Sequence, residues 1–141
     1  MNRDTCKYIA ILTMVCNHIA RMFLTPGNFL YESLSDIGYF AAMTMCYFLV
    51  EGYYYTRSRK NYAGRLLVFA VLSQIPYSMA FRDGQLNMLF TLLLCLAVPE
   101  LMERPMAEWE QRISLVLIFT TSFFCCWKLI APLGVYLFVR Y

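Results

Sequence analysis

The sequence predicts an all-α integral membrane protein, a polytopic helical bundle of five to six transmembrane helices plus a short interfacial helix, in which residues 1–141 form a single membrane domain. Three observations support this prediction. Hydrophobic residues make up 60% of the chain and charged residues 15%, whereas soluble domains average roughly 45–50% and about 25%. A compact chain of this length cannot bury so much apolar surface. Finally, the charged residues cluster between apolar runs.

Six apolar runs define the expected helices in chain order. They cover residues 7–24, 35–55, 64–81, 86–102, 112–130 and, as a short sixth run, 131–141. No small-residue cleavage site follows the first run, so we expect it to stay in the protein as the first span. Residues 102–111 carry Pro105 and Trp109 among charged side chains, which predicts a short helix at the membrane surface.

Lysine and arginine residues concentrate in alternate connectors of this arrangement. Those on one side are Arg3, Lys7, Arg57, Arg59, Lys60, Arg65, Arg104 and Arg112. The connectors of the opposite side hold Arg82 and Lys128, and Arg21 lies near the end of the first run. Because cytoplasmic loops carry the excess of positive charge, we expect a cytoplasmic N-terminus.

Charge and cysteine usage argue against several classes of ligand. The net charge of +3 is small, and the cations are not interleaved with aromatic residues, so no nucleic acid is expected as a partner. Of the six cysteines, five lie inside apolar runs and none forms a CxxC pair, which is typical of reduced, buried thiols. A single histidine without convergent thiolates predicts no metal site.

His18, the one histidine of the chain, is the main candidate for a catalytic residue. Helix rise places it about 15 Å above the cytoplasmic end of the first span, near the middle of the membrane. Ionisable residues are costly there, and histidine can accept and return a proton near neutral pH. The neighbouring Asn17 and Arg21 are candidate substrate-binding residues. The alternative is a histidine that hydrogen-bonds between helices.

Glu51 lies in the second span, about 8 Å from the cytoplasmic surface by helix rise. A carboxylate at this depth needs a partner, and Arg57 and Arg65 are within reach in sequence. Glu51 is therefore either a catalytic residue or half of a structural ion pair. Arg57 and Arg65 could bind the phosphates of a coenzyme, although a cluster of cations is more simply a topology signal.

Gln74 and Asn87 are the remaining polar candidates for substrate binding. Gln74 lies in the third span at a depth of about 14 Å, similar to that of His18. Asn87 stands at the start of the fourth span, one turn before Thr91. Amide side chains in membranes often connect helices to each other, so a structural role remains equally open for both residues.

Several blocks of sequence, in the same order, are similar to a known family. The blocks are Ile11-Leu12-Thr13-Met14 with Asn17-His18-Ile19, Leu49-Val50-Glu51-Gly52-Tyr53 with Tyr55-Thr56-Arg57, Asn61-Tyr62 with Arg65-Leu66-Leu67 and Ser73-Gln74-Ile75-Pro76-Tyr77, and Leu86-Asn87-Met88-Leu89-Phe90-Thr91-Leu92-Leu93. Over residues 7–97 the chain thereby resembles the TraX family of conjugative-pilin acetylases, which is similar to the broader multi-span membrane acyltransferases.

The resemblance implies a multi-pass protein of the bacterial cytoplasmic (inner) membrane, surrounded by membrane lipid. It implies transfer of an acetyl group from acetyl-CoA, as co-substrate, to an amine such as a pilin or peptide N-terminus. The family's histidine falls on His18 and its Glu-Gly block on Glu51. Because six short runs enclose little space, we also expect a homo-oligomer that completes the pocket.

Two functional hypotheses follow from the sequence. In the first, His18 acts as a general base on the acceptor, Arg21, Gln74 and Asn87 line the pocket, and the cytoplasmic cations receive coenzyme A. In the second, the chain is a non-enzymatic membrane protein, either an assembly partner or a small transporter that uses His18 and Glu51 as proton-linked groups. Binding of coenzyme A distinguishes the two hypotheses.

Overall fold

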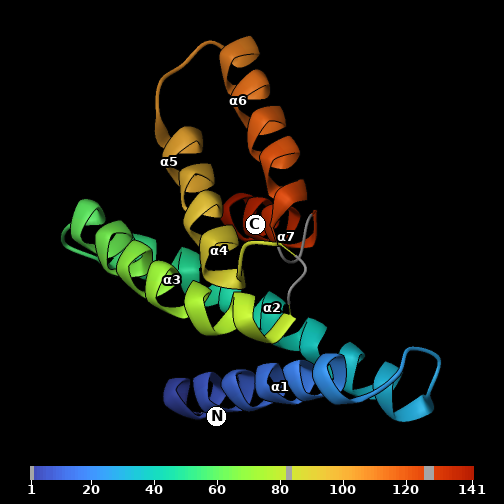
Figure 1. Cartoon of the computed structure of the whole chain (residues 1–141). Helices are drawn as coiled ribbons and strands as arrows, with labels where there is room; N and C mark the ends of the chain where they lie inside the picture. The colour runs from blue at the N-terminus through green and yellow to red at the C-terminus, as the bar shows by residue number, and fades with distance from the viewer. Residues whose placement is uncertain (1, 82–83, 126–128) are drawn as a thin grey trace. The chain divides into compact units, whose positions relative to one another are not determined.

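The computed structural model describes residues 2–81, 84–125 and 129–141, and these residues are mostly helical (Figure 1). The elements are α1 (Arg3–Phe23), α2 (Phe29–Tyr55), α3 (Arg59–Phe81), α4 (Met88–Cys95), α5 (Ala97–Glu103), α6 (Glu108–Thr121), the short 3-10 helix η1 (Ser122–Phe124) and α7 (Ile130–Arg140). No β-strand is formed by the described residues. The prediction of an all-α fold is therefore confirmed.

The first three helices end within one residue of the predicted ends but begin four to six residues earlier than predicted, and the sixth run matches α7 to within one residue. The fifth run covers most of α6 and η1, and part of it lies outside the described residues. The fourth apolar run is divided between α4 and α5, which meet at Leu96. The short helix expected over residues 102–111 is not a separate element, because this segment comprises the end of α5, a connector and the start of α6. Arg104 is extended, with φ −74° and ψ 134°, since the following Pro105 disfavours helical geometry in the residue before it.

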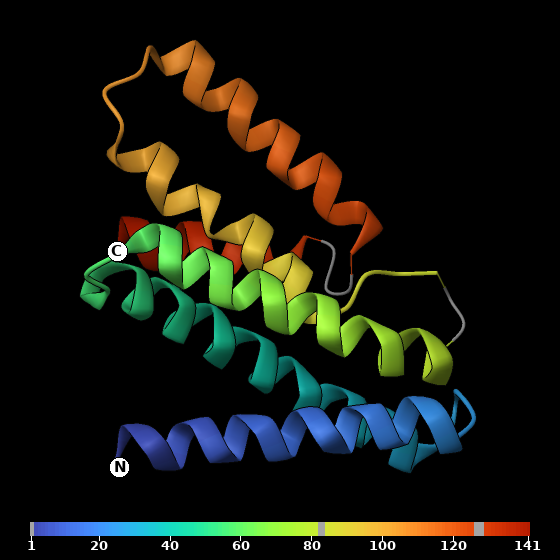
Figure 2. The same ribbon diagram turned by 60° about the vertical axis from the view of Figure 1, so that its left-hand side comes forward.

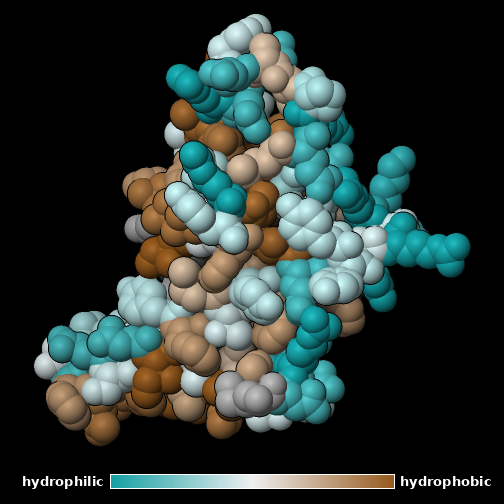
Figure 3. All heavy atoms as spheres, turned by 180° about the vertical axis from the view of Figure 1, so that it is seen from behind, coloured by the Kyte–Doolittle hydropathy of each residue, from teal (hydrophilic) through white to brown (hydrophobic). Residues whose placement is uncertain are grey.

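Helices α2 and α3 are the two described helices that are long and apolar enough to cross a membrane. Only 11% of the most apolar part of α3 is buried within the protein, and large side chains such as Phe69, Leu72 and Ile75 are exposed. A core helix of a soluble protein would bury this surface. Brown, hydrophobic residues also reach the surface on the face shown in Figure 3. A total of five to six spans remains a prediction.

The chain divides into two compact units, residues 1–45 and 46–141. In the first unit, α1 and the beginning of α2 approach closely at Gly38. The Asn17 side-chain amide donates a hydrogen bond to the carbonyl oxygen of Ser35, at 3.2 Å. A methyl group added to Gly38 would lie 2.6 Å from the Asn17 Cβ, so only glycine permits this approach.

Substituting Gly38 by alanine is expected to destabilise the protein by about 1–3 kcal/mol, because α1 and α2 must move apart. The matched control is Gly64→Ala in α3, where an added methyl group meets no atom within 4 Å. That variant should gain roughly 0.5–1 kcal/mol from the better helix propensity of alanine. Unfolding in detergent with a denaturant titration measures both changes. Equal stability of the two variants would contradict the close approach.

The second unit contains the end of α2 and all later helices. Helix α3 packs against α4, α4 and α5 pack against α7, and α5 packs against α6 (Figure 2). The buried positions include Cys46, Val98, Ala131 and Val135. The Cys46 thiol lies 3.7 Å from the carbonyl oxygen of Ala131, which connects α2 to α7. The same unit includes the end of α2 and the beginning of α3, near which Arg57, Arg59, Lys60 and Arg65 lie.

Candidate functional site

His18 lies in the fifth turn of α1, half-buried, and belongs to the first unit. Its Nδ1 is 2.8 Å from the carbonyl oxygen of Met14, one turn earlier. Because a carbonyl oxygen only accepts hydrogen bonds, Nδ1 must carry a proton in this contact. In the neutral ring the lone pair then lies on Nε2, which is the nitrogen able to act as a base.

Asn17 and Arg21 flank His18 on the same helix, as the sequence predicts. Asn17 is 8% exposed, and its amide group connects α1 to α2 through the Ser35 carbonyl. Arg21 is half-buried in the last turn of α1, three residues after His18, so the two side chains share one side of the helix.

Ser35 is a polar residue of the first unit that the sequence analysis missed. Its hydroxyl oxygen is buried and has no hydrogen-bond partner among the described residues. Buried hydroxyl groups are normally paired, so this group can accept a bound water or a polar group of a ligand. A lone serine in an amphipathic segment carries no signal of this kind in the sequence.

Glu51 lies one turn before the end of α2 and is half-buried. It belongs to the second unit, as do the two arginines that the sequence suggested as its partners. The catalytic role of Glu51 stays a prediction.

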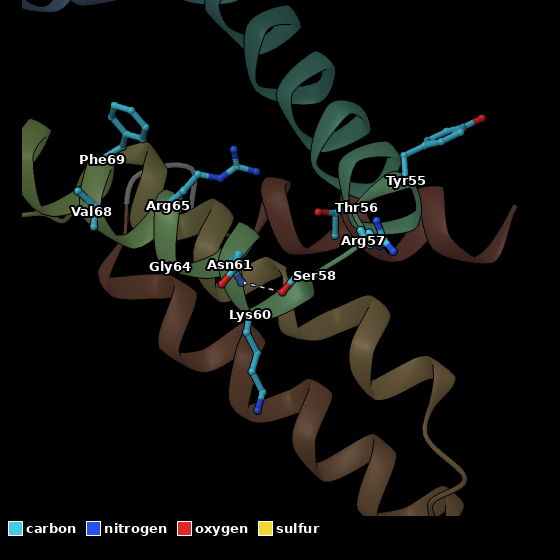
Figure 4. A pocket seen from close by; sticks show the side chains of 10 residues that line it. All are labelled: Tyr55, Thr56, Arg57, Ser58, Lys60, Asn61, Gly64, Arg65, Val68 and Phe69. Atoms are coloured by element: carbon cyan, nitrogen blue, oxygen red, sulfur yellow. Dashed lines mark hydrogen bonds between the residues drawn. The ribbon is translucent and has the colours of Figure 1, made fainter.

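Arg57 and Arg65 line one hollow of about 940 Å³ at the turn between α2 and α3 (Figure 4). We call it the basic hollow, and its lining residues are Tyr55, Thr56, Arg57, Ser58, Lys60, Asn61, Gly64, Arg65, Val68 and Phe69. The lining holds three cations and no carboxylate. In Figure 4 the Lys60 side chain points away from those of Arg57 and Arg65.

The beginning of α3 adds to the positive potential of the basic hollow. Ser58 precedes the helix, and its carbonyl oxygen accepts a hydrogen bond from the backbone N–H of Tyr62 at 3.1 Å. Its hydroxyl oxygen accepts from the backbone N–H of Asn61 at 3.5 Å. Unpaired N–H groups and the helix dipole favour anions at such an N-terminus. The arrangement therefore suits a phosphate group.

Gln74 and Asn87 form one hydrogen-bonded network that joins α3 to the start of α4. The Gln74 Oε1 accepts from the backbone N–H of Asn87 at 2.9 Å, and its Nε2 donates to the Gln85 carbonyl at 3.1 Å. The Asn87 Nδ2 donates to the Ala70 carbonyl at 3.0 Å and to the Ser73 hydroxyl at 2.8 Å. The proximity of Gln74 and Asn87 gives both a structural role.

The Oδ1 of Asn87 also caps α4. It accepts hydrogen bonds from the backbone N–H groups of Leu89, at 3.1 Å, and Phe90, at 3.3 Å. An asparagine side chain has two donors and two acceptor positions, so all four are occupied within the protein. Its part in binding a substrate remains a prediction. Both Nδ2 donors are occupied by Ala70 and Ser73, so the side chain has no donor for an oxyanion unless one of these two hydrogen bonds breaks.

A second charged cluster lies beside the basic hollow and was missed by the sequence analysis. Arg59 Nη2 is 2.8 Å from Glu103 Oε2, and its guanidinium carbon lies 4.2 Å from the centre of the Tyr53 ring. The Tyr53 hydroxyl is 3.2 Å from Glu103 Oε2 and 3.3 Å from Glu100 Oε2. Arg104 Nη2 also lies 3.0 Å from Glu100 Oε1. We call this cluster the α5 clamp, and its members are Tyr53, Arg59, Glu100, Glu103 and Arg104.

One signal for this cluster was present in the sequence. Glu100 and Glu103 are spaced at i and i+3, which places them on one side of α5, and Arg104 follows directly as the C-cap of this helix. The partners from α2 and α3 are more than forty residues away along the chain, and local spacing does not reveal them. No group of three His, Cys, Asp or Glu residues suited to a metal ion occurs within residues 2–81, 84–125 and 129–141.

Comparison with known proteins agrees with the resemblance noted in the sequence. The family described as TraX protein matches residues 2–137. The chain is 37% identical, over 136 residues, to the "Probable fimbrial assembly protein FimC, serogroup H1" of Dichelobacter nodosus, an alignment that covers 86% of this chain and 54% of that protein. The chain thus spans about half the length of this curated relative. No solved structure matches this chain. The family match over nearly the whole chain confirms the resemblance, and the chain belongs to the TraX protein family.

Proposed function

We propose that this chain is a membrane-embedded acyltransferase that moves an acetyl group from acetyl-CoA to an amine, such as the N-terminus of a pilin or peptide. The observation that carries the proposal is the basic hollow of about 940 Å³, whose lining includes Arg57, Lys60 and Arg65 and no carboxylate. Coenzyme A presents several phosphate groups, and cations at a helix N-terminus are suited to bind them. Arg57 and Arg65 are assigned as its ligands.

In the proposed reaction the amine nitrogen attacks the thioester carbonyl carbon of acetyl-CoA. A C–N bond forms, the C–S bond breaks, and coenzyme A leaves as the thiolate. His18 accepts the proton of the attacking amine at Nε2 and returns it to the leaving sulfur. Arg21 would stabilise the oxyanion of the intermediate, and Glu51 would organise the mouth of the site. Asn17 acts by holding α1 against α2.

The acceptor and the location are inferred from the relative and from the helices. A relative named a fimbrial assembly protein supports a pilin-like subunit as the acceptor. Helices α2 and α3 are long and apolar enough to cross a bilayer, and the cations between them favour a cytoplasmic turn. We infer a multi-pass protein of the bacterial cytoplasmic membrane with a cytoplasmic N-terminus, in a homo-oligomer that encloses the site.

Acetyl-CoA is expected to stabilise the purified protein in detergent. At about 100 times its dissociation constant a ligand raises the free energy of unfolding by about 2.7 kcal/mol, which a melting experiment detects. Arg65→Gln should bind about tenfold more weakly, because one charge-assisted hydrogen bond is lost. The matched control is Arg112→Gln, since Arg112 is an exposed cation paired with Glu108 at 3.4 Å and lies outside the hollow. Absence of a melting shift at millimolar acetyl-CoA would refute the proposal.

A second candidate is a non-enzymatic assembly partner or a small proton-linked transporter. The name of the relative, a fimbrial assembly protein, favours the assembly role. Such a protein would support fimbrial assembly without consuming a thioester. A transporter would show pH-dependent substrate flux. Release of free coenzyme A thiol in the presence of acceptor peptide distinguishes the acyltransferase from both.

A further inference from the structure

The turn between α2 and α3 and the first two turns of α3 carry four cations, and the structure separates them into two groups. Arg57, Lys60 and Arg65 line the basic hollow. Arg59 does not line it and instead meets α5, where its guanidinium group contacts Glu103 at 2.8 Å and lies 4.0 Å from Glu100. If these cations only supplied positive charge to an anion, there would be no reason for Arg59 to be paired with carboxylates of α5.

The α5 clamp holds both ends of the segment that forms one wall of the basic hollow. Tyr53 stands before this segment and Arg59 directly after it, and residues 55–58 between them all line the hollow. The Tyr53 ring lies under the Arg59 guanidinium group, and both side chains contact the same Glu103 oxygen. The two ends of the turn are thereby fastened to one carboxylate of α5.

Burial gives this arrangement more weight than an ordinary surface ion pair. Arg59 and Glu103 have side chains 46% and 35% exposed, and an isolated pair of this kind contributes little to stability. Tyr53, however, is 1% exposed, so its hydroxyl depends on the carboxylates for a hydrogen bond. The clamp therefore has a defined geometry, and a turn that is ordered before binding loses less conformational entropy when a ligand arrives.

We propose that Arg59, Tyr53 and Glu103 are positioning residues, which hold residues 55–58 in the geometry that binds a phosphate ester without touching it themselves. The inference rests on the proposed coenzyme A site and adds to it the residues that act through Arg57. The phosphate of a lipid headgroup has the same chemistry as that of coenzyme A. The experiment must therefore separate these two sources.

The sign of one charge change tests the proposal directly. Glu103→Gln removes a negative charge beside the basic hollow. If the clamp residues acted only through their charge, this substitution would strengthen the binding of an anion. If they position the turn, binding should instead weaken by about three- to tenfold, since the turn must be ordered by the ligand. Tyr53→Phe removes the hydroxyl without changing charge or ring packing, and the same direction is expected.

Coenzyme A affinity is measured by titration calorimetry on the full chain in phosphatidylcholine nanodiscs, and the melting temperature without ligand is recorded beside it. Glu108→Gln is the matched control, because it removes a carboxylate paired with Arg112 and outside the clamp. It should leave the affinity unchanged. A second arm measures retention of phosphatidylglycerol by native mass spectrometry for the same variants.

Weaker binding by both Glu103→Gln and Tyr53→Phe, in protein that remains folded at the temperature of titration, supports the positioning role. Unchanged or tighter binding by Glu103→Gln overturns it. If the wild-type chain binds no coenzyme A but retains phosphatidylglycerol, the proposed acyltransferase function is wrong. The positioning role is then supported if both variants retain less phosphatidylglycerol than the wild type, and overturned if Glu103→Gln retains as much or more. If the wild-type chain binds neither, the hollow has no phosphate ligand and the positioning role is wrong.

Discussion

Replacing His18 by glutamine is expected to lower acetyl transfer by about a hundredfold to ten-thousandfold, the usual contribution of a general base. Glutamine can still hydrogen-bond within α1, but it has no lone-pair nitrogen that accepts a proton. The contact between Nδ1 and the Met14 carbonyl leaves Nε2 as the basic atom in the neutral ring. The chemical step should therefore fail while binding persists. Initial rates with acetyl-CoA and an acceptor peptide, in reconstituted membranes, measure the loss.

The matched control for this substitution is at Thr13, the residue directly before Met14 in α1. The Thr13 hydroxyl donates a hydrogen bond to the Ala10 carbonyl at 3.0 Å, so Thr13→Ala also removes a contact between a side chain and the backbone of α1. It removes no base, and its transfer rate should stay within about twofold of the wild type. Coenzyme A affinity should be unchanged in both variants. Undiminished transfer by His18→Gln would exclude the histidine as the base.

The outline of the fold could be predicted because each of the first three apolar runs is closed by residues that end helices or stay in water. The turn at Pro26 and Gly27 separates α1 from α2, and Gly27 has φ 92°, a conformation that favours glycine. The charged segment around Ser58 separates α2 from α3. The division between α4 and α5 has a marker that the sequence analysis missed. Pro99 has no backbone N–H, and its ring clashes with the carbonyl group four residues earlier, that of Cys95, where α4 ends.

The candidate site could be predicted in part, because only its local patterns are visible in the sequence. A run of cations shows in the sequence, and Arg57 and Arg65 do line one hollow. The pairing of Tyr53 with Glu100 and Glu103 spans 47 and 50 residues, and spacing rules extend only over a few turns of one helix. For Gln74 and Asn87 the sequence left substrate binding and a structural role equally open, because their mutual bonding depends on how α3 meets α4.

Asn87→Ala should destabilise the protein by about 2–3 kcal/mol, the sum of a lost helix cap and lost buried hydrogen bonds. Asn87 is 5% exposed, so water does not replace the missing partners. Denaturant titration in detergent measures the loss. Asn61→Ala serves as a control, because Asn61 is an exposed asparagine near the start of α3. Its stability should change by less than about 0.5 kcal/mol.

Asn87→Asp separates the two functions of this side chain. The carboxylate can still accept from the N–H groups of Leu89 and Phe90, so the cap of α4 survives. It cannot donate to the Ala70 carbonyl or to the Ser73 hydroxyl, and it brings a negative charge toward the carbonyl oxygen. If the bonds to α3 matter more than the cap, Asn87→Asp should be at least as destabilising as Asn87→Ala. Wild-type stability of both variants together with loss of acetyl transfer would instead assign Asn87 to the substrate, as the sequence alone suggested.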